Sequence, residues 1–358
     1  MKVRSVLGDL APHSLGMTLT HEHLSMNFER FFKNAPDHLN GYLDANQKIS
    51  LENLGLLRQY PYSSKYNTVL DDKESHEKVI EDVKLLKKWY PGNCTIVENT
   101  TCGIKRDLPF YREVAEKTGV NVIAGTGHYV GHTQKDTELS MSLEKMVDLY
   151  TKEIVSGVDV GLLQDGEDII KCGLIGEVGS RYPLSDFEKR AIRATAETQN
   201  ALGCPVSFHP ARNPKAPFEI LRIYLEAGGN VEKCVMSHLD RTLHDIGVLL
   251  EFAKLGSYCQ FDLFGTEVSF YQLCTEMDMP SDAQRMDRIV RLVKEGFEDR
   301  ITISHDIHTK HRLSGFGGHG YAHIYNNVLP KLATKGLTDK QIDKITVDNP
   351  AKWLQFDI

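Results

Sequence analysis

The stretch Thr18-Leu19-Thr20-His21-Glu22-His23 decides the fold, because it places two histidines at the end of a short strand-forming run. Residues two apart share one face of a strand, so His21 and His23 are expected to point together and Glu22 the opposite way. A His-x-His pair alone is a weak sign of a binding site. Its weight comes from its position at the end of the first of eight similar runs.

Eight short runs rich in β-forming residues alternate with amphipathic helical segments along the chain. The runs are Thr18–His23, Thr95–Thr100, Asn121–Gly127, Cys172–Gly179, Pro205–Pro210, Lys233–Leu239, Ser257–Phe264 and Arg300–Asp306. The helical segments include Lys73–Trp89, Leu143–Ser156, Ser185–Leu202, Pro217–Ala227 and Ala283–Glu298. Strand-then-helix repeated eight times predicts an α/β fold, a (β/α)8 TIM barrel, formed as a single domain by residues 1–358. The alternative is a doubly wound open sheet, which usually carries a Gly-rich turn where this chain has His-Glu-His.

Two connections are long for barrel loops: residues 24–72 after the first strand and residues 265–282 after the seventh. Both are expected at the carboxyl ends of the strands, where barrels keep their active sites. Their aromatic residues are Phe28, Phe31, Phe32, Tyr60, Phe270 and Tyr271. Two interpretations stay open for these side chains: walls or a lid over a site, or anchors for surface insertions and an oligomer contact.

Composition sets limits on the partners and the compartment. The chain has 358 residues, with 42 Lys and Arg against 49 Asp and Glu, so its net charge is −7. It has no basic run that would indicate nucleic acid or an anionic membrane, and no apolar stretch of about 20 residues for a membrane helix. The odd number of cysteines, seven, without any C-x-x-C pair favours reduced thiols. We therefore expect a cytoplasmic protein without a nucleic-acid or membrane partner, and leave a homodimer open.

Polar residues recur where four later strands are expected to end: Glu177, His209, His238 and Asp306. One buried histidine is usually a satisfied core residue. Four histidines and two carboxylates converging on one rim instead indicate a metal site built from several strand ends.

The number of ligands predicts two divalent cations. His21, His23 and Asp306 would hold one cation, His209 and His238 the other, and Glu177 would bridge them. Nitrogen and oxygen ligands without thiolate suit Zn²⁺ as well as Mn²⁺, Co²⁺ or Fe²⁺. Two such ions would share a bridging hydroxide as nucleophile, with Asp306 as the catalytic proton acceptor.

The pattern also resembles the phosphotriesterase family of the amidohydrolase superfamily, and most closely its phosphotriesterase-related members, over essentially the whole chain. The stretches that carry the resemblance are residues 18–24, 97–101, 176–179, 236–241, 262–267 and 305–310. The resemblance implies that the binuclear metal ligands are His21, His23, Glu177, His209, His238 and Asp306. Classical phosphotriesterases bridge their metals with a carboxylated lysine on strand four, where this chain has Glu177, so phosphotriesterase activity does not transfer simply.

Members that this chain resembles hydrolyse small N-acyl amides, notably N-acetyltaurine. Such a substrate needs a cationic partner for its anionic end, and Arg212 and Arg241 follow strands five and six. A structural ion pair, for example with the adjacent Asp240, is the alternative for these arginines. Tyr129 and Asn99 are further candidates to line the substrate pocket.

The sequence leaves three functions open. The first is a metal-dependent hydrolase acting on small anionic N-acyl amino compounds, such as N-acetyltaurine or N-acetyl amino acids. The second keeps the site but makes it a lactonase or a phosphoester hydrolase. The third is a non-catalytic binding protein that retains the metals as scaffold.

Overall fold

Eight parallel strands form the centre of the computed structural model, which describes residues 1–39, 41–161 and 168–357. They are β3 (Met17–Glu22), β4 (Cys94–Glu98), β5 (Asn121–Thr126), β8 (Leu174–Gly179), β9 (Val206–His209), β10 (Cys234–Met236), β11 (Tyr258–Phe261) and β12 (Ile301–Ile303). Each lies within one of the eight predicted runs or overlaps it. The strands β10 and β12 are shorter than predicted, because His238 and Asp306 turn the backbone into the left-handed region, with φ of 57° and 53°.

The sheet closes into a barrel. Its hydrogen-bonded order is β12-β11-β10-β9-β8-β5-β4-β3, with every neighbouring pair parallel. The two end strands meet, because Asp306 N donates to His21 O at 3.0 Å and Thr20 Oγ1 donates to Ile303 O at 3.2 Å. The predicted (β/α)8 barrel is therefore confirmed, and the doubly wound alternative is wrong.

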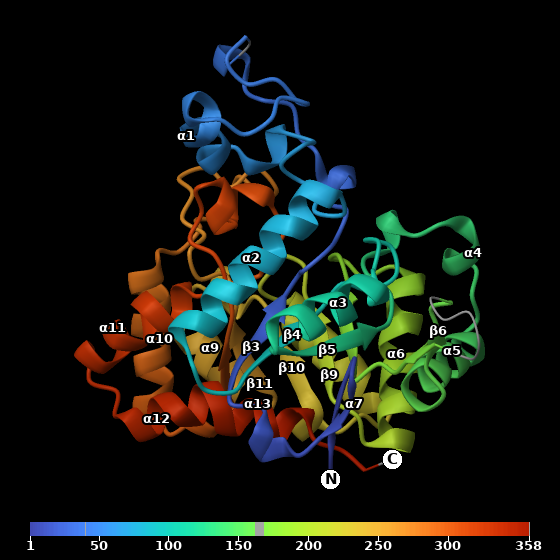
Figure 1. Ribbon diagram of the computed structural model, residues 1–358. Coiled ribbons are helices and arrows are strands. Elements are labelled where there is room, and N and C mark those ends of the chain that lie inside the picture. The colour runs from blue at the N-terminus through green and yellow to red at the C-terminus, as the bar shows by residue number, and fades with distance from the viewer. Residues whose placement is uncertain (40, 162–167, 358) are drawn as a thin grey trace.

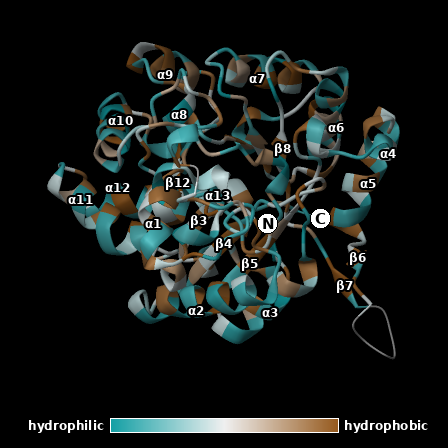
Figure 2. Ribbon diagram, turned by 90° about the horizontal axis from the view of Figure 1, so that it is seen from above, coloured by the Kyte–Doolittle hydropathy of each residue, from teal (hydrophilic) through white to brown (hydrophobic). Residues whose placement is uncertain are grey.

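Helices surround the strands as a ring when the barrel is viewed from above (Figure 2). They are α1 (Leu51–Gln59), α2 (Lys73–Trp89), α3 (Leu108–Thr118), α4 (Asp136–Leu139), α5 (Leu143–Val155), α6 (Asp186–Leu202), α7 (Ala216–Glu226), α8 (Leu239–Thr242), α9 (Ile246–Ala253), α10 (Asp282–Lys294), α11 (Leu329–Thr334), α12 (Asp339–Asp343) and α13 (Asn349–Leu354). The helix predicted over Ala283–Glu298 ends earlier, at Lys294, because Gly296 takes φ of 85°. Within the described ranges, no helix combines the length and the apolarity that crossing a membrane requires.

Local sequence explains where these helices begin. Ser185 accepts a hydrogen bond from the backbone of Glu188, whose side chain returns to Ser185 N, so that the two residues form a capping box at the start of α6. Gly203 ends the same helix with φ of 68°, a left-handed conformation that suits glycine.

The bottom of the barrel is sealed by the two ends of the chain. The hairpin of β1 (Val3–Ser5) and β2 (Gly8–Leu10) lies there, and Lys2 pairs with Phe356. Trp353 is fully buried in an apolar cluster that includes Val97 and Tyr258. Figure 1 shows both termini at this end, opposite α1. A second small hairpin, β6 (Val158–Asp159) with β7 (Ile169–Ile170), lies at the side.

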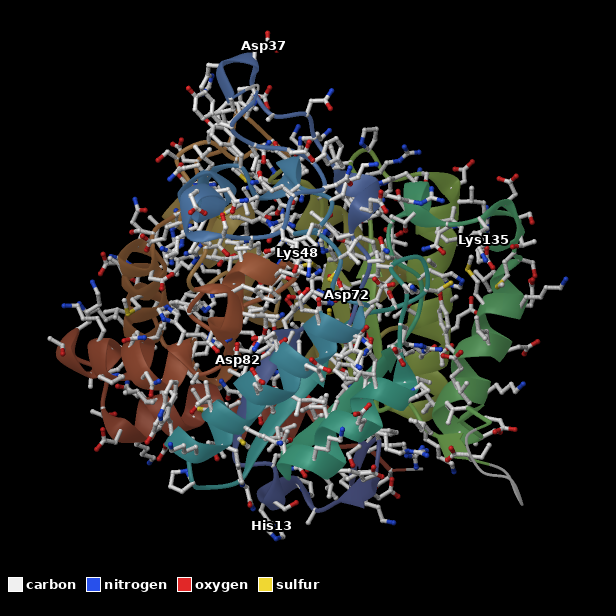
Figure 3. All side chains as sticks on the ribbon, turned by 45° about the horizontal axis from the view of Figure 1, so that its top comes forward. His13, Asp37, Lys48, Asp72, Asp82 and Lys135 are labelled. Carbon is white, nitrogen blue, oxygen red and sulfur yellow. The ribbon has the colours of Figure 1, made fainter. Side chains whose placement is uncertain are left out.

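The two long connections lie at the other end of the barrel, over the carboxyl ends of the strands. Residues 24–72 carry α1 and short 3-10 turns, and Asp37 lies near their tip (Figure 3). Residues 265–281 form neither helix nor strand. Hydrogen bonds fasten the first connection to the segment after β12, because Lys310 N and His311 N donate to the backbone and side-chain oxygens of Asn67 at 2.9 Å each.

Candidate metal centre

The six side chains predicted as metal ligands meet at the mouth of the barrel, and each is at most 7% exposed. They are His21, His23, Glu177, His209, His238 and Asp306. Strand alternation works as expected at β3, because Glu22 points away from this cluster and accepts hydrogen bonds from Ser304 Oγ at 2.7 Å and His305 N at 2.9 Å.

Glu177 lies between the histidines of the cluster. Its Oε2 is 3.4 Å from His21 Nε2 and 2.8 Å from His209 Nδ1, and its Oε1 is 3.5 Å from His23 Nε2. His23 Nε2 is also 3.1 Å from Asp306 Oδ1. Among the described residues, three groups have ligand atoms close enough to share one ion, and two of these groups lie within the cluster: His21 with His23 and Asp306, and Glu177 with His209 and His238.

The residues fit a pair of divalent cations. His21 Nε2 is buried and has no hydrogen-bond partner among the described residues, which leaves its lone pair for a ligand. Burial lowers the pKa of His21 to about 3 and the pKa of His209 and of His238 well below the usual value, so these imidazoles are neutral donors. Burial, with the nearby Asp306, raises the pKa of Glu177 well above its usual value, and bound cations would favour its ionised form.

Neighbouring side chains orient three of the imidazoles through their Nδ1 atoms. The partners of His21 and His238 follow β10 and β11. His238 Nδ1 is 2.7 Å from Asp262 Oδ1, and His21 Nδ1 is 3.1 Å from Ser237 Oγ. His23 Nδ1 is 2.8 Å from Thr100 Oγ1. Each contact leaves Nε2 facing the cluster, an arrangement that fixes ring orientation in metal sites.

Asp262 and Glu98 are two further carboxylates that contact the surroundings of the cluster, and the sequence analysis did not name them. Thr100 Oγ1 donates to Glu98 Oε1 at 2.6 Å, which links Glu98 to His23. Asp262 also lies in ligand range with His21 and His238, but its oxygens already accept hydrogen bonds from His238 N and Gln260 Nε2, which favours a supporting role. The available signal was position, because Asp262 directly follows β11 at the mouth of the barrel, where the proposed ligands lie near the carboxyl ends of their strands or just beyond them.

Arg312 fixes the backbone of Asp306. Its guanidinium donates to the carbonyl oxygens of Asp306 and His305, and to Phe264 O at 3.1 Å. His308 Nδ1 donates to the same Asp306 carbonyl at 2.7 Å. Although burial acts in the opposite direction, His308 and the hydrogen bond from His23 hold the pKa of Asp306 well below its usual value, so the carboxylate is ionised.

The cluster forms one side of a cavity that contains three of the four residues predicted to contact substrate: Arg212, Arg241 and Tyr129. The Tyr129 hydroxyl is 3.3 Å from His209 Nε2. Asn99 does not line this cavity. It is fully buried beside β3, and its amide donates to Thr20 O at 3.2 Å and Val97 O at 3.0 Å.

The long connections supply aromatic walls to the same cavity. Phe28 and Tyr271 line it, and Phe31 stacks on Phe28 with ring centroids 3.8 Å apart. Tyr60 and Phe270 lie against each other at 6.4 Å outside it. Phe32 packs under the Lys65 ammonium. The first interpretation, in which aromatic residues form a wall, therefore describes Phe28 and Tyr271, whereas the other aromatics support the loops.

Known proteins are similar in sequence to this chain over its whole length. Residues 1–354 match the model of the phosphotriesterase family. Phosphotriesterase-related proteins of Aedes aegypti and Drosophila melanogaster are each 54% identical, covering 100% and 99% of this chain and 99% of their own. A solved structure of a resiniferatoxin-binding protein from Rhodobacter sphaeroides is 30% identical with a TM-score of 0.89, over 99% of this chain and 96% of that one. The chain belongs to the phosphotriesterase family of hydrolases.

Proposed function

We propose that the protein is a binuclear metal-dependent amidase that cleaves small N-acyl anionic amino compounds, such as N-acetyltaurine or N-acetyl amino acids. The observation that carries the proposal is a pair of arginines, Arg212 and Arg241, on the wall of the metal cavity. Within the described residues, neither guanidinium lies in an ion pair with a carboxylate. A small anionic group would supply the missing partner.

Arg241 is 2% exposed, and its neighbour Asp240 is already paired. Asp240 Oδ2 is 2.9 Å from Arg285 Nε, and both side chains are fully buried. The Arg241 guanidinium instead donates to Pro210 O at 3.2 Å and Thr242 Oγ1 at 3.4 Å. These neutral contacts orient the guanidinium without neutralising its charge, which supports a role in holding an anion.

Arg212 is held in place by Tyr271. Its Nε and Nη2 donate to the Tyr271 hydroxyl at 3.0 Å and 2.7 Å, and the guanidinium lies 5.4 Å from the ring centroid. The contacts use one edge of the guanidinium and leave its Nη1 for a ligand. A sulfonate or carboxylate between Arg212 and Arg241 would place the rest of a small amide over the metal cluster.

The proposed reaction breaks the amide C–N bond and adds water, giving a carboxylate and an amine. Bound divalent cations supply Lewis-acid activation of the carbonyl and of water in such sites. Asp306 accepts the proton of the attacking water and delivers it to the departing nitrogen. Tyr129, whose hydroxyl is 3.3 Å from His209 Nε2, would donate a hydrogen bond to the substrate carbonyl oxygen.

The test is turnover by protein loaded separately with Zn²⁺, Mn²⁺ or Co²⁺, on N-acetyltaurine, N-acetyl amino acids, lactones and phosphoesters. We expect kcat/KM to be highest for the anionic amides. Undetectable amide cleavage by fully loaded protein, with turnover of a lactone or a phosphoester, would replace the proposal with that second activity.

The relative named for resiniferatoxin binding supports a different class of function, a binding protein that keeps its metals as scaffold. The Asp306→Asn substitution separates the two classes, because it removes the proton acceptor and keeps the size of the side chain. We expect the variant to lose turnover by a factor of about 100 or more while it still binds substrate. A cellular phenotype that survives Asp306→Asn unchanged would favour the binding protein.

A further inference from the structure

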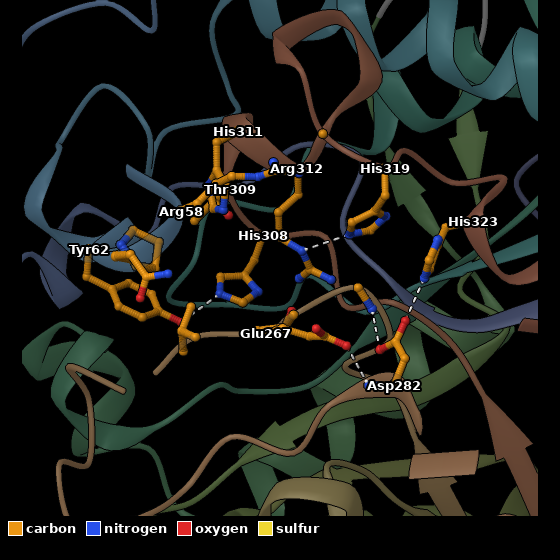
Figure 4. Close-up of a pocket in the computed structure, with 16 residues that line it drawn as sticks. Arg58, Tyr62, Glu267, Asp282, His308, Thr309, His311, Arg312, His319 and His323 are labelled. Atoms are coloured by element: carbon orange, nitrogen blue, oxygen red, sulfur yellow. Dashed lines mark hydrogen bonds and ion pairs between the residues drawn. The ribbon is translucent and has the colours of Figure 1, made fainter. Parts of the chain in front are cut away.

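A second, larger chamber lies directly beside the metal cavity. Its volume is about 490 Å³, against about 30 Å³ for the metal cavity. The two share three lining residues, Tyr62, Thr266 and His308. Figure 4 shows Tyr62 and His308 in contact at one side of the chamber. These two side chains therefore form a partition between a confined reaction site and an open space.

The partition is held by hydrogen bonds and by packing on both sides. His308 Nδ1 donates to Asp306 O at 2.7 Å, and its other ring nitrogen, Nε2, makes a hydrogen bond of 2.9 Å with the Tyr62 hydroxyl. The two rings are nearly parallel, 12° apart, with centroids at 5.9 Å. Tyr62 N donates to Gln272 Oε1 at 3.1 Å, and the Tyr62 side chain is 4% exposed. Gln272 of the second long connection thus holds the backbone of Tyr62, and His308 holds its hydroxyl.

The position of the partition points to the acyl side of the substrate. Arg212 and Arg241, which we propose to hold the anionic amine portion, follow β9 and β10. Tyr62 comes from the first long connection and His308 follows β12, which adjoins β3 across the barrel from β9. The Tyr62 ring also lies 6.3 Å from that of Tyr271, which holds Arg212, and His308 Nδ1 lies 3.4 Å from Asp306 Oδ1. A short substrate with its anionic end on the arginines and its amide at the metal cluster would therefore have Tyr62 and His308 as the wall in front of its acyl group.

The chamber beyond the partition is polar, and its lining has two arginines and two acids. Asp282 is neutralised by Arg285 at 2.9 Å and His323 at 2.7 Å. Within the described residues, Arg58 and Arg312 have no carboxylate partner, and Glu267 is the one other acid of the lining. The fully buried Arg312 is bound to carbonyl oxygens and to His319. A carboxylate is the ligand that this lining favours.

We propose that Tyr62, held by His308, limits the substrate to short acyl groups, and that the chamber behind it accepts acyl groups ending in a carboxylate once the ring is removed. This inference rests on the amidase activity proposed above. One methylene beyond a closed wall changes kcat/KM by about ten-fold or more, so the limit is measurable.

The experiment compares taurine carrying an acetyl, butanoyl or succinyl group, using metal-loaded protein and the variants Tyr62→Ala, Tyr62→Phe and Phe270→Ala. Tyr62→Phe keeps the wall without its hydroxyl. Phe270→Ala is the matched control, because Phe270 is a 45% exposed aromatic on the other long connection and lines neither space. Binding of free acetate, butanoate and succinate by calorimetry provides a second measurement that does not depend on turnover.

We expect Tyr62→Ala to raise the succinyl-to-acetyl ratio of kcat/KM by about ten-fold or more, and to raise the butanoyl-to-acetyl ratio less. Tyr62→Phe and Phe270→Ala should keep the wild-type ratios. Acetyl turnover with an unchanged length profile in Tyr62→Ala would overturn the partition and leave the amidase intact. If the wild type cleaves none of the three amides, the proposed amidase activity is wrong. The ratio of succinate affinity to acetate affinity, measured by calorimetry in the wild type and in Tyr62→Ala, would then decide whether Tyr62 closes the chamber.

Discussion

Asp262 Oδ1 lies 2.7 Å from His238 Nδ1, so a carboxylate outside the ligand cluster determines which nitrogen of His238 faces Glu177. We predict that Asp262→Asn weakens metal binding by about 10- to 100-fold, because the amide no longer selects that orientation of the imidazole. Competition with a chelating dye measures the affinity. Asp287→Asn, an exposed carboxylate on α10, is the control. Unchanged affinity in the Asp262 variant would show that β10 alone orients His238.

Glu177 should make metal loading independent of carbon dioxide. Its carboxylate is part of the side chain, whereas a carboxylated lysine forms only with CO2. Apo-protein reconstituted with Zn²⁺ in degassed, bicarbonate-free buffer should reach the same metal content as in bicarbonate, as measured by plasma emission spectrometry. Glu177→Gln should bind fewer than two ions per chain, because an amide is a poor bridging ligand. Two tightly bound ions in Glu177→Gln would contradict the bridging role.

Removing the charge of Arg212 should affect anionic substrates only. We predict that Arg212→Met raises KM for N-acetyltaurine by about 10- to 100-fold, the value of one hydrogen bond to a charged group. The neutral analogue N-acetylethanolamine is the internal control, and its KM should stay near the wild-type value. An equal loss for both compounds would indicate that Arg212 acts through its packing on Tyr271 instead of binding the anion.

Asp282 should stabilise the fold at neutral pH and lose this effect in acid. Although burial acts to raise it, the hydrogen bond from His323 and the nearby Arg285 lower the pKa of Asp282 from 3.8 to about 2. A depressed folded-state pKa gives stability above the unfolded value, and this stability is lost as pH falls from about 4 to about 2. The difference corresponds to about 2 kcal/mol.

Urea unfolding of the wild type and Asp282→Asn tests this prediction. The difference in unfolding free energy between the two proteins should narrow as pH falls below about 4. The wild type should be the more stable protein, because its ionised Asp282 carboxylate accepts hydrogen bonds from Gly265 N at 2.8 Å and Arg285 Nη1 at 2.9 Å. A gap that does not change with pH would mean that these contacts do not depend on the charge of Asp282.

Local patterns were sufficient to predict the barrel and to bring the six proposed ligands together. The alternation at His21 and His23 depends only on strand geometry, and a parallel barrel collects the carboxyl ends of all its strands at one mouth. Glu177 and His209 could therefore be placed without any knowledge of packing. The contact of 2.8 Å between His209 Nδ1 and Glu177 Oε2 agrees with that placement.

Contacts between distant side chains could not be predicted in the same way. Asn99 directly follows β4 at the same end of the barrel as the proposed ligands, but its side chain turns to the carbonyl oxygens of Thr20 and Val97, away from the cavity. Tyr62 comes from the long connection of residues 24–72, whose apolar residues do not repeat at the spacing of a strand or a helix, so its position could not be predicted. The pairing of Asp240 with Arg285, 45 residues later, likewise depends on how α10 docks.

The left-handed backbone at His238 and Asp306 restricts how this site can evolve. Among residues that can bind metals, aspartate, asparagine and histidine are the ones enriched at positive φ. A cysteine at either position would have a backbone strain of about 1–3 kcal/mol, whether or not a metal is bound. Substitutions that introduce thiolate ligands for softer metals would therefore have to occur first at ligands that lie within strands, such as His21 and Glu177.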